Sequence, residues 1–279
     1  MKPAPFEYVR ARSVAQALDL LASGDARILA GGQSLIATLN MRLSQPALLI
    51  DINDIAGLDG ITPKNGKLEI GALVRHAQAE RSAEVARHAP LLAAALPHIG
   101  HPAIRNRGTI GGSIAFADPA AELPACLVAL DAEVDVTGQR GQRTVAGGEF
   151  FKGLFETALE PGELLTAIRI PKASAAARFG FAEFARRHGD YALAGLAAAA
   201  KQHGKDLRDL RLVYFGVGAM PVRARHAERR LQEGDVAAAV AALSNDLSPP
   251  DDLQAASAVK RHLAGVLLRR VYQQLTEAQ

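Results

Sequence analysis

Two pairs of adjacent glycines, each followed closely by a small hydroxyl residue, are the most informative feature of the sequence. The first glycine motif reads Leu29-Ala30-Gly31-Gly32-Gln33-Ser34-Leu35, and the second reads Thr109-Ile110-Gly111-Gly112-Ser113. Paired glycines let the backbone turn sharply and leave amide groups uncovered by any Cβ. Such amide groups, with a helix N-terminus behind them, bind phosphate or diphosphate. Two such motifs in one domain predict an elongated cofactor that contains a diphosphate.

The elements around the first glycine motif predict a strand, a turn and a helix. An apolar run over residues 26–30 predicts the strand, and apolar residues at helical spacing over 34–43 predict the helix, with Ser34 as its N-cap. A second buried strand is expected at 47–52. A lone glycine pair in this setting is more often an ordinary tight turn, and the second motif is what favours the cofactor.

The second glycine motif is expected to be a loop between helical segments. Helices are predicted over 75–84 and 90–96 before it, and over about 120–130 after it. Asp118-Pro119 resembles the start of the third helix, with proline at its first position and Glu122 in its first turn. That helix carries Cys126 among apolar residues, which predicts a core thiol.

The pattern of predicted strands and helices changes near residues 171–177, which we take as the domain boundary. Before this boundary the expected strands are 67–72, 132–137, 143–145 and 164–170. After it, three strands are expected at 179–186, 193–201 and 210–217, followed by helices at 221–231, 235–243 and 252–275. The alanine run 197–200 is also compatible with a helix. The resulting division is 1–171, with subdomains of about 1–55 and 56–171, and 178–279.

Composition excludes several classes of protein. One cysteine in 279 residues allows no intrachain disulfide and no iron–sulfur cluster held by four cysteines of this chain. A net charge of +3 is too small to indicate nucleic acid. No apolar run approaches the length of a membrane span, and the N-terminus has no apolar signal region, so a cytoplasmic protein is expected.

Three other patterns could carry chemistry. Gly32-Gln33-Ser34-Leu35-Ile36 matches four of the five positions of a nucleophile elbow, which keeps a serine hydrolase that uses Ser34 as a remote alternative. Gly216-Val217-Gly218 begins like a dinucleotide fingerprint but is expected to be a strand end and a turn. The histidines lack zinc-site spacing and are expected at the surface or in loops, so no metal site is predicted: His76, His98 and His101. The basic residues from Lys260 onward are expected on the solvent face of the last helix.

The two glycine motifs resemble a known family. With Leu49-Ile50-Asp51-Ile52 and the later stretches Leu164-Leu165-Thr166-Ala167-Ile168-Arg169-Ile170-Pro171 and Phe215-Gly216-Val217-Gly218-Ala219-Met220-Pro221, they are similar to the FAD-binding medium subunit of the molybdenum hydroxylases. The resemblance is to the carbon monoxide dehydrogenase type, related to the flavin part of xanthine dehydrogenase, and it covers nearly the whole chain.

The resemblance implies an α+β fold. A two-part FAD-binding domain of the vanillyl-alcohol-oxidase-like, PCMH type would be followed by a C-terminal domain with a three-stranded antiparallel sheet and helices. The same resemblance implies which residues contact FAD. They are the first motif, the segment Ile99-Gly100, the second motif, an acidic residue near the flavin and an aliphatic residue close to its ring: Leu29, Ala30, Gly31, Gly32, Gln33, Ser34, Leu35, Ile99, Gly100, Thr109, Ile110, Gly111, Gly112, Ser113, Glu122 and Ile168.

The implied function is electron transfer within a complex. Iron–sulfur clusters of a small partner subunit would pass electrons to FAD, and a large partner subunit would hold the molybdenum cofactor, with a dimer of heterotrimers expected. No side chain of this chain is expected to be catalytic. A self-sufficient FAD-dependent oxidase is the alternative. One departure is that Ala182, followed by Glu183, stands where xanthine-type members carry a lysine near the flavin, which leaves the electron acceptor open.

Overall fold

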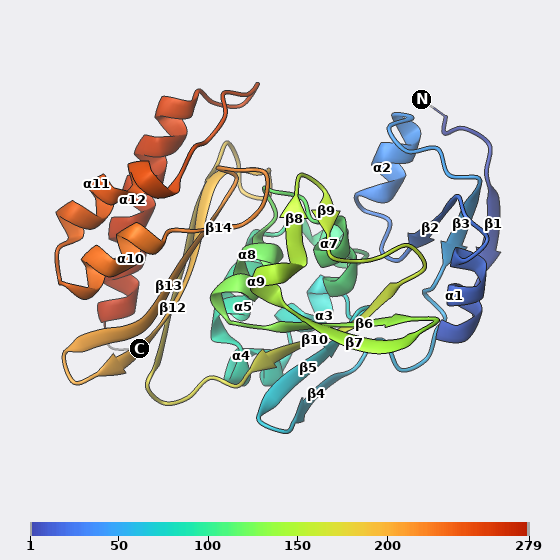
Figure 1. Ribbon diagram of the computed structural model, residues 1–279, viewed down its shortest axis with the longest axis horizontal. Helices are drawn as coiled ribbons and strands as arrows, with labels where there is room; N and C mark the ends of the chain where they lie inside the picture. The colour runs from blue at the N-terminus through green and yellow to red at the C-terminus, as the bar shows by residue number, and fades with distance from the viewer. Residues whose placement is uncertain (1, 278–279) are drawn as a thin grey trace.

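A parallel sheet forms the N-terminal part of the computed structural model, which describes residues 2–277 (Figure 1). Its strand order is β1 (Glu7–Arg10), β3 (Leu48–Asp51), β2 (Ala26–Leu29). Helix α1 (Val14–Leu21) is capped by Ser13, whose hydroxyl accepts a hydrogen bond from the Gln16 amide. Strand β2 leads through the first glycine motif into α2 (Leu35–Asn40), as predicted.

An antiparallel five-stranded sheet forms the middle of the molecule. Its order is β4 (Ile61–Lys64), β5 (Lys67–Gly71), β10 (Leu164–Pro171), β6 (Glu133–Gly138), β7 (Gly141–Ala146). Alternate residues such as Ile70, Ile168 and Val134 are fully buried in the core. The connecting elements are α3 (His76–Glu80), α4 (Ala83–His88), α5 (Pro90–Ala95), the 3-10 helix η1 (Leu96–His98), α6 (Pro102–Arg105), α7 (Ile110–Phe116), α8 (Glu122–Ala129), α9 (Gly147–Phe150), β8 (Phe151–Gly153) and β9 (Glu156–Thr157).

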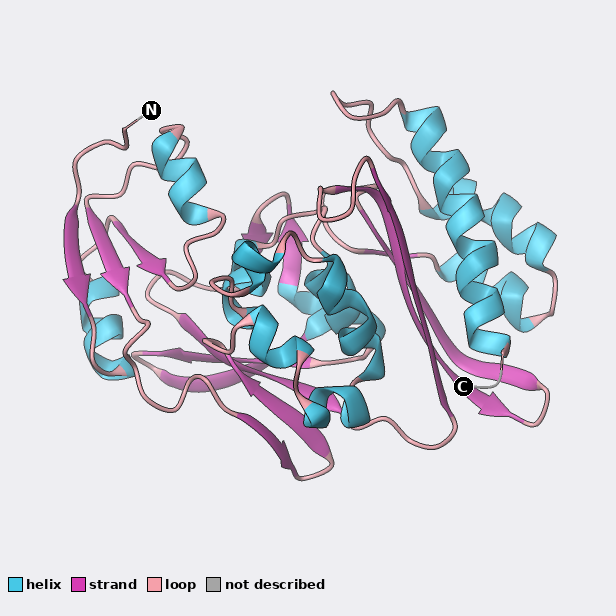
Figure 2. Cartoon of the chain, turned by 180° about the vertical axis from the view of Figure 1, so that it is seen from behind, coloured by secondary structure: helices cyan, strands magenta, loops and turns pink. Residues whose placement is uncertain are grey.

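A second antiparallel sheet forms the C-terminal part. The three expected strands are present as β11 (Ala177–Ala185), β12 (Ala192–His203) and β13 (Asp206–Phe215), and a short β14 (Val222–Arg223) extends the sheet. Helices α5 and α8 contact one side of this sheet, and α12 (Ser257–Thr276) packs on the other side, beside α10 (Arg225–Gln232) and α11 (Val236–Asp246) (Figure 2). All six alanines of β12 are buried, because this central strand is covered on both sides by helices.

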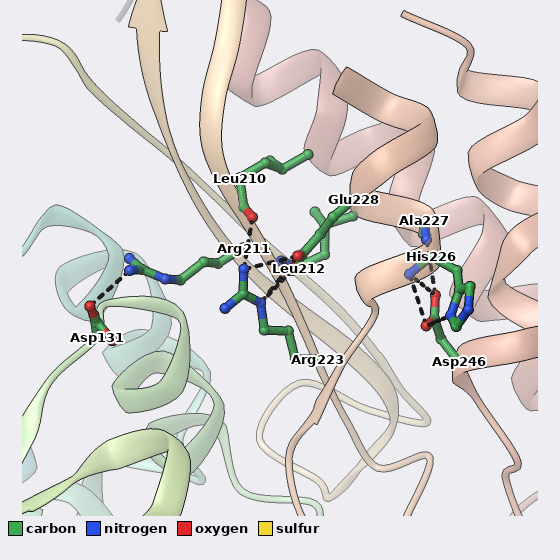
Figure 3. Close-up of polar contacts among 9 residues, drawn as sticks. All are labelled: Asp131, Leu210, Arg211, Leu212, Arg223, His226, Ala227, Glu228 and Asp246. Carbon is green, nitrogen blue, oxygen red and sulfur yellow. Dashed lines mark hydrogen bonds and ion pairs between the residues drawn. The ribbon is translucent and has the colours of Figure 1, made fainter. Parts of the chain in front are cut away.

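Ion pairs hold the C-terminal helices to the sheet and the sheet to the middle of the molecule (Figure 3). Glu228 of α10 accepts hydrogen bonds from Arg223 and from the Leu212 amide. Arg211 of β13 pairs with Asp131, which follows α8, at 2.8 Å. The sheet that carries β11 is thereby fixed against α8, and both elements reach the site described below.

Four expectations about local structure are wrong. The second glycine motif is the start of helix α7, because the Thr109 hydroxyl caps it by accepting from the Gly112 amide. The segment 75–84 is divided into α3 and α4, since Ser82 caps a new helix. Helix α8 begins at Glu122, and Asp118-Pro119 forms a turn before it. Ser34 makes no side-chain cap bond to α2.

The C-terminal helices also differ in detail from the helices predicted from the sequence. The segment 221–231 begins as strand β14, whose Val222 pairs with Tyr214 of β13, and becomes helical only at Arg225. The last helix begins at Ser257, and its Lys260 is buried against Asp252 at 2.5 Å. Val259 of the same helix is exposed, so it lies outside the expected apolar stripe.

His76 is buried, contrary to the expectation of a surface histidine. Its Nε2 lies 2.9 Å from the Thr109 carbonyl oxygen, so Nε2 must donate, and Nδ1 is buried with no hydrogen-bond partner among the described residues. Burial therefore lowers the pKa of His76 from its usual value to about 4. The neutral imidazole holds the start of the second glycine motif in place.

The titration of His76 predicts a loss of stability in acid. Because the pKa is lower in the folded state, its contribution to the free energy of unfolding is complete above about pH 6.5 and decreases as the pH falls toward 4, by about 3 kcal/mol in all. His76→Gln keeps a donor for Thr109 and should remove this pH dependence in urea unfolding at pH 7, 5 and 4. His203→Gln, at the exposed end of β12, is the control. Equal acid losses in wild type and His76→Gln would contradict the assignment.

Candidate functional site

A cavity of about 1620 Å³ lies between the first sheet, the start of α7 and the start of α8. Both glycine motifs line it, together with the segment Ile99-Gly100. All but three of the residues expected to contact the cofactor are among its walls: Ala30, Gly31, Gly32, Gln33, Ser34, Leu35, Ile99, Gly100, Thr109, Gly111, Gly112, Ser113 and Glu122. The exceptions are Leu29, Ile110 and Ile168, and the last two are fully buried in the core.

The first glycine motif presents a row of free amides. Within residues 2–277, the backbone amides of Gly31, Gly32, Gln33 and Ser34 donate no hydrogen bond to the protein. Gly32 has a φ of +73°, a left-handed conformation that glycine adopts without strain. Consecutive free amides ahead of a helix form a cradle for an anion. This geometry fits a diphosphate.

The first glycine motif touches the backbone of the segment that leads into the second motif. A Cβ on Gly31 would lie 2.3 Å from the Arg107 carbonyl oxygen and 2.8 Å from the Gly108 Cα, so only glycine permits the approach. Two polar side chains reinforce the contact. Asn53 donates to the Ala30 carbonyl at 2.8 Å, and Arg75 donates to both Asn53 and the Arg107 carbonyl.

The second glycine motif offers no row of free amides. The amides of Ile110, Gly111, Gly112 and Ser113 donate to Val74, Ala72 and Thr109. The motif instead provides a wall with almost no side chain, where a ligand can approach the backbone closely. The two motifs therefore differ in role: the first can bind an anion, and the second leaves space.

Arg105 positions the third wall of the cavity. This buried guanidinium pairs with Glu80 at 2.8 Å and donates to the carbonyls of Ile99 and Gly100, at 3.3 and 3.0 Å. Neither Arg105 nor the Asn53–Arg75 pair was predicted to shape the site. For Asn53 and Arg75 a usable signal was their position, because each follows closely after a strand that leads into the cavity wall.

Glu122 is the most strongly perturbed acid of the cavity. Its residue is only 7% exposed, and burial raises the pKa of the carboxyl to about 8, with smaller contributions from the charges of Glu183 and Asp118. Burial also raises the pKa of Asp118 and of Tyr191, two further wall residues. Burial thus favours the neutral form of the Glu122 carboxyl at pH 7.

Glu183 does not face the cavity. Its side chain is 4% exposed and lies against His98, with 3.2 Å between Oε1 and Nδ1. His98, which was expected only as a surface or loop histidine, joins η1 to β11 and contacts the ring of Phe181. Ala182 packs against the C-terminal core.

The other motifs show no catalytic arrangement among residues 2–277. Among the described residues, the Ser34 hydroxyl is hydrogen-bonded to no histidine, and a nucleophilic serine needs such a base. Gly216 follows the end of β13 as expected for a turn. Cys126 is buried, as predicted. In residues 2–277 no helix has the length and apolar character needed to cross a membrane.

Two family models match almost the entire chain. Residues 4–173 match the FAD-binding domain in molybdopterin dehydrogenase, and residues 179–275 match the C-terminal domain of the carbon monoxide dehydrogenase flavoprotein. One relative is the 6-hydroxypseudooxynicotine dehydrogenase complex subunit alpha of Paenarthrobacter nicotinovorans. It is 41% identical, over 97% of this chain and 94% of the relative. The caffeine dehydrogenase subunit beta of Pseudomonas sp. strain CBB1 is 40% identical, over 83% of this chain and 79% of the relative.

Solved structures agree with this assignment. A chain of carbon monoxide dehydrogenase from Hydrogenophaga pseudoflava superimposes with a TM-score of 0.96 at 35% identity, over 99% of this chain and 98% of the other. The expected α+β fold, with a two-part FAD-binding domain and a C-terminal antiparallel sheet, is confirmed. The chain belongs to the family of FAD-binding subunits of molybdopterin dehydrogenases, of the carbon monoxide dehydrogenase flavoprotein type.

Proposed function

We propose that this chain is the electron-transfer subunit of a molybdenum hydroxylase, which takes electrons from iron–sulfur clusters of a partner subunit and passes them through FAD to an external acceptor. The observation that carries the proposal is the row of free amides from Gly31 to Ser34 on a cavity shared with the second glycine motif. Bound FAD would supply the redox chemistry, since flavins exchange electrons one or two at a time.

The residues of the cavity have distinct parts in this proposal. The amides of Gly31, Gly32, Gln33 and Ser34 would hold the diphosphate, and the bare backbone at Gly111-Gly112 would allow the cofactor to lie close. Glu122 would offer a neutral carboxyl to the flavin end. Leu29, Ala30, Leu35, Ile99, Gly100, Thr109, Ile110, Ser113 and Ile168 would surround or support the cofactor.

The relatives support a division of labour between subunits. Three relatives that are 35–40% identical to this chain are named as subunits of dehydrogenases of caffeine, glyceraldehyde and carbon monoxide. Because the same type of FAD subunit occurs in enzymes that act on such different substrates, we infer that this subunit does not select the substrate. This chain also has a single cysteine, so four-cysteine clusters must be held by another chain.

The assembly follows from the same reasoning. We propose a small iron–sulfur subunit and a large molybdenum subunit as partners, in a dimer of heterotrimers that functions in the cytoplasm. One solved relative is described as a Cu,Mo-containing carbon monoxide dehydrogenase, and another relative is named as a subunit of a dehydrogenase complex. Within the chain, we propose an FAD-binding domain over 1–171, with subdomains of about 1–55 and 56–171, and a C-terminal domain over 178–279. The family models, which end at 173 and restart at 179, support this division.

A matched pair of variants at Ser34 tests the diphosphate site. Ser34→Asp places a negative charge beside the free amides, whereas Ser34→Asn has nearly the same shape without the charge. Ser34→Asp should weaken FAD binding at least about tenfold, which corresponds to about 1.4 kcal/mol, and Ser34→Asn should retain flavin. Flavin released by acid and calorimetric titration of the flavin-free chain measure both. Equal flavin content in the two variants would place the diphosphate elsewhere.

The assignment of partners predicts what co-purifies. A tagged chain purified from its native host should carry along a cysteine-rich small subunit and a large subunit, with iron and molybdenum in the complex. The chain produced alone should contain flavin but no stoichiometric iron or molybdenum, and it should hydroxylate no substrate. Elemental analysis and turnover assays of both preparations decide the matter. Stoichiometric iron in the chain alone would overturn the proposed division.

A further inference from the structure

The free amides of the first glycine motif are held from the carbonyl side of their peptide groups. In a planar trans peptide group the N–H points away from the C=O of the preceding residue, so a hydrogen bond that fixes the carbonyl also fixes the direction of the amide. The carbonyls of Ala30, Gly31 and Gly32 share their peptide groups with the next residues' amides, which are free within residues 2–277. Each of these carbonyls accepts a hydrogen bond, and two of the donors are side chains.

Asn53, which follows β3, holds the first of these carbonyls. Its Nδ2 donates to the Ala30 carbonyl at 2.8 Å and to Asp51 Oδ1 at 2.6 Å. Its Oδ1 accepts from Arg75 Nη2 at 2.7 Å. The reverse orientation of the carboxamide would place its oxygen against a carbonyl and a carboxylate, so these partners allow only one orientation. The Asn53 side chain therefore holds the Ala30 carbonyl in a fixed direction.

Asp51 anchors the Asn53 carboxamide to the first sheet. The Asp51 side chain is only 6% exposed, and its Oδ1 also accepts from the Asn53 backbone amide at 2.9 Å. Its Oδ2 accepts from the Tyr8 hydroxyl of β1 and lies 3.4 Å from Arg10 Nε. Asn53 itself does not line the cavity, so it can act on a ligand there only through the residues that it holds, such as Ala30.

Gln33 holds the second carbonyl from within the motif. Its Nε2 donates to the Gly31 carbonyl at 3.2 Å, which directs the Gly32 amide. The Gly32 carbonyl accepts from the Ile36 amide of α2 at 3.0 Å, which directs the Gln33 amide in the same way. A carbonyl that accepts a hydrogen bond also polarises the N–H of its own peptide group, and this strengthens the amide as a donor.

We propose that Asn53 and Gln33 are positioning residues that preorganise the first glycine motif for a diphosphate. The proposal rests on the proposed function, in which the amides of this motif hold the diphosphate of FAD. Asn53 sets the direction of the Gly31 amide, and Gln33 sets that of the Gly32 amide. Both amides belong to residues of the cavity wall. Because folding has already ordered this glycine-rich segment, binding does not carry the entropic cost of ordering it.

The affinity for FAD measures the effect of each side chain. Asn53→Ala removes the donor to Ala30, and Gln33→Met keeps the length of the side chain without a donor. Each should weaken FAD binding to the flavin-free full-length chain at least about tenfold in calorimetric titration, since each misaligns one charge-assisted hydrogen bond. Gln202→Met is the matched control and should bind FAD as the wild type does. Gln202 also donates to a carbonyl two residues away, that of Gly204, at 3.2 Å and outside the cavity wall.

Two resonance signals separate positioning from a general loss of stability. In the flavin-free chain the carbonyl carbon of Ala30 should move upfield in Asn53→Ala, and that of Gly31 in Gln33→Met, because a carbonyl carbon is deshielded by its hydrogen bond. At saturating FAD the phosphorus resonances of the diphosphate should move toward those of free FAD in both variants. Gln78→Ala removes a donor to a backbone carbonyl at 3.0 Å outside the cavity wall and should leave all of these signals unchanged.

The outcomes separate the two proposals. Wild-type affinity in Asn53→Ala, or unmoved carbonyl resonances in both variants, overturns the positioning role. Weaker binding with unmoved phosphorus resonances assigns the side chains a structural role only and also overturns it. A wild-type chain that binds no FAD overturns the proposed function. In that case a tenfold loss of affinity for inorganic diphosphate in the two variants supports the positioning role, and equal affinity overturns it.

Discussion

The structure of the site depends on a contact between two backbones. Gly31 lies so close to the Arg107 carbonyl and to Gly108 that any side chain at residue 31 would collide with them. The contact joins the small parallel sheet to the helices that cover the central sheet. Asn53 and Arg75 then bond to both sides, so the two parts of the FAD-binding region meet at a fixed spacing. The cavity is the space that remains beside this contact.

The glycines of the two motifs have different physical roles. In the first motif they permit a left-handed turn and leave four amides free, which is an electrostatic function. In the second motif the amides are already used by Val74, Ala72 and Thr109, and glycine is needed because Ala72 packs against Gly111. Similar sequences therefore provide an anion cradle in one place and a close-packed wall in the other.

Much of the fold could be predicted from the sequence, because periodic apolar residues determine buried strands and helices. The strands β2, β3, β5, β6, β10, β11, β12 and β13 lie where the pattern predicts them. The errors have local causes. The glycine pair concealed helix α7, whose stability depends on the Thr109 cap and on packing, and β14 exists only because it pairs with β13.

The candidate site was predictable to a similar degree. The resemblance supplied most of the residues that line the cavity, but it included Ile110 and Ile168, which are buried behind the wall. The pattern could not reveal Arg105 or the His98–Glu183 contact, since each joins residues brought together by tertiary packing alone. Side chains that act across elements leave no periodic signal in a single sequence.

The position of Glu183 on the C-terminal sheet also bears on how such subunits diversify. Glu183, whose charge acts on the cavity acid Glu122, belongs to β11, outside the segment that matches the FAD-binding model. A recombination event that exchanged the C-terminal half alone would change the electric field at a cavity whose walls were otherwise inherited intact. A substitution at Glu183 therefore acts on both sides of the junction, on His98 through their 3.2 Å contact and on Glu122 through its charge.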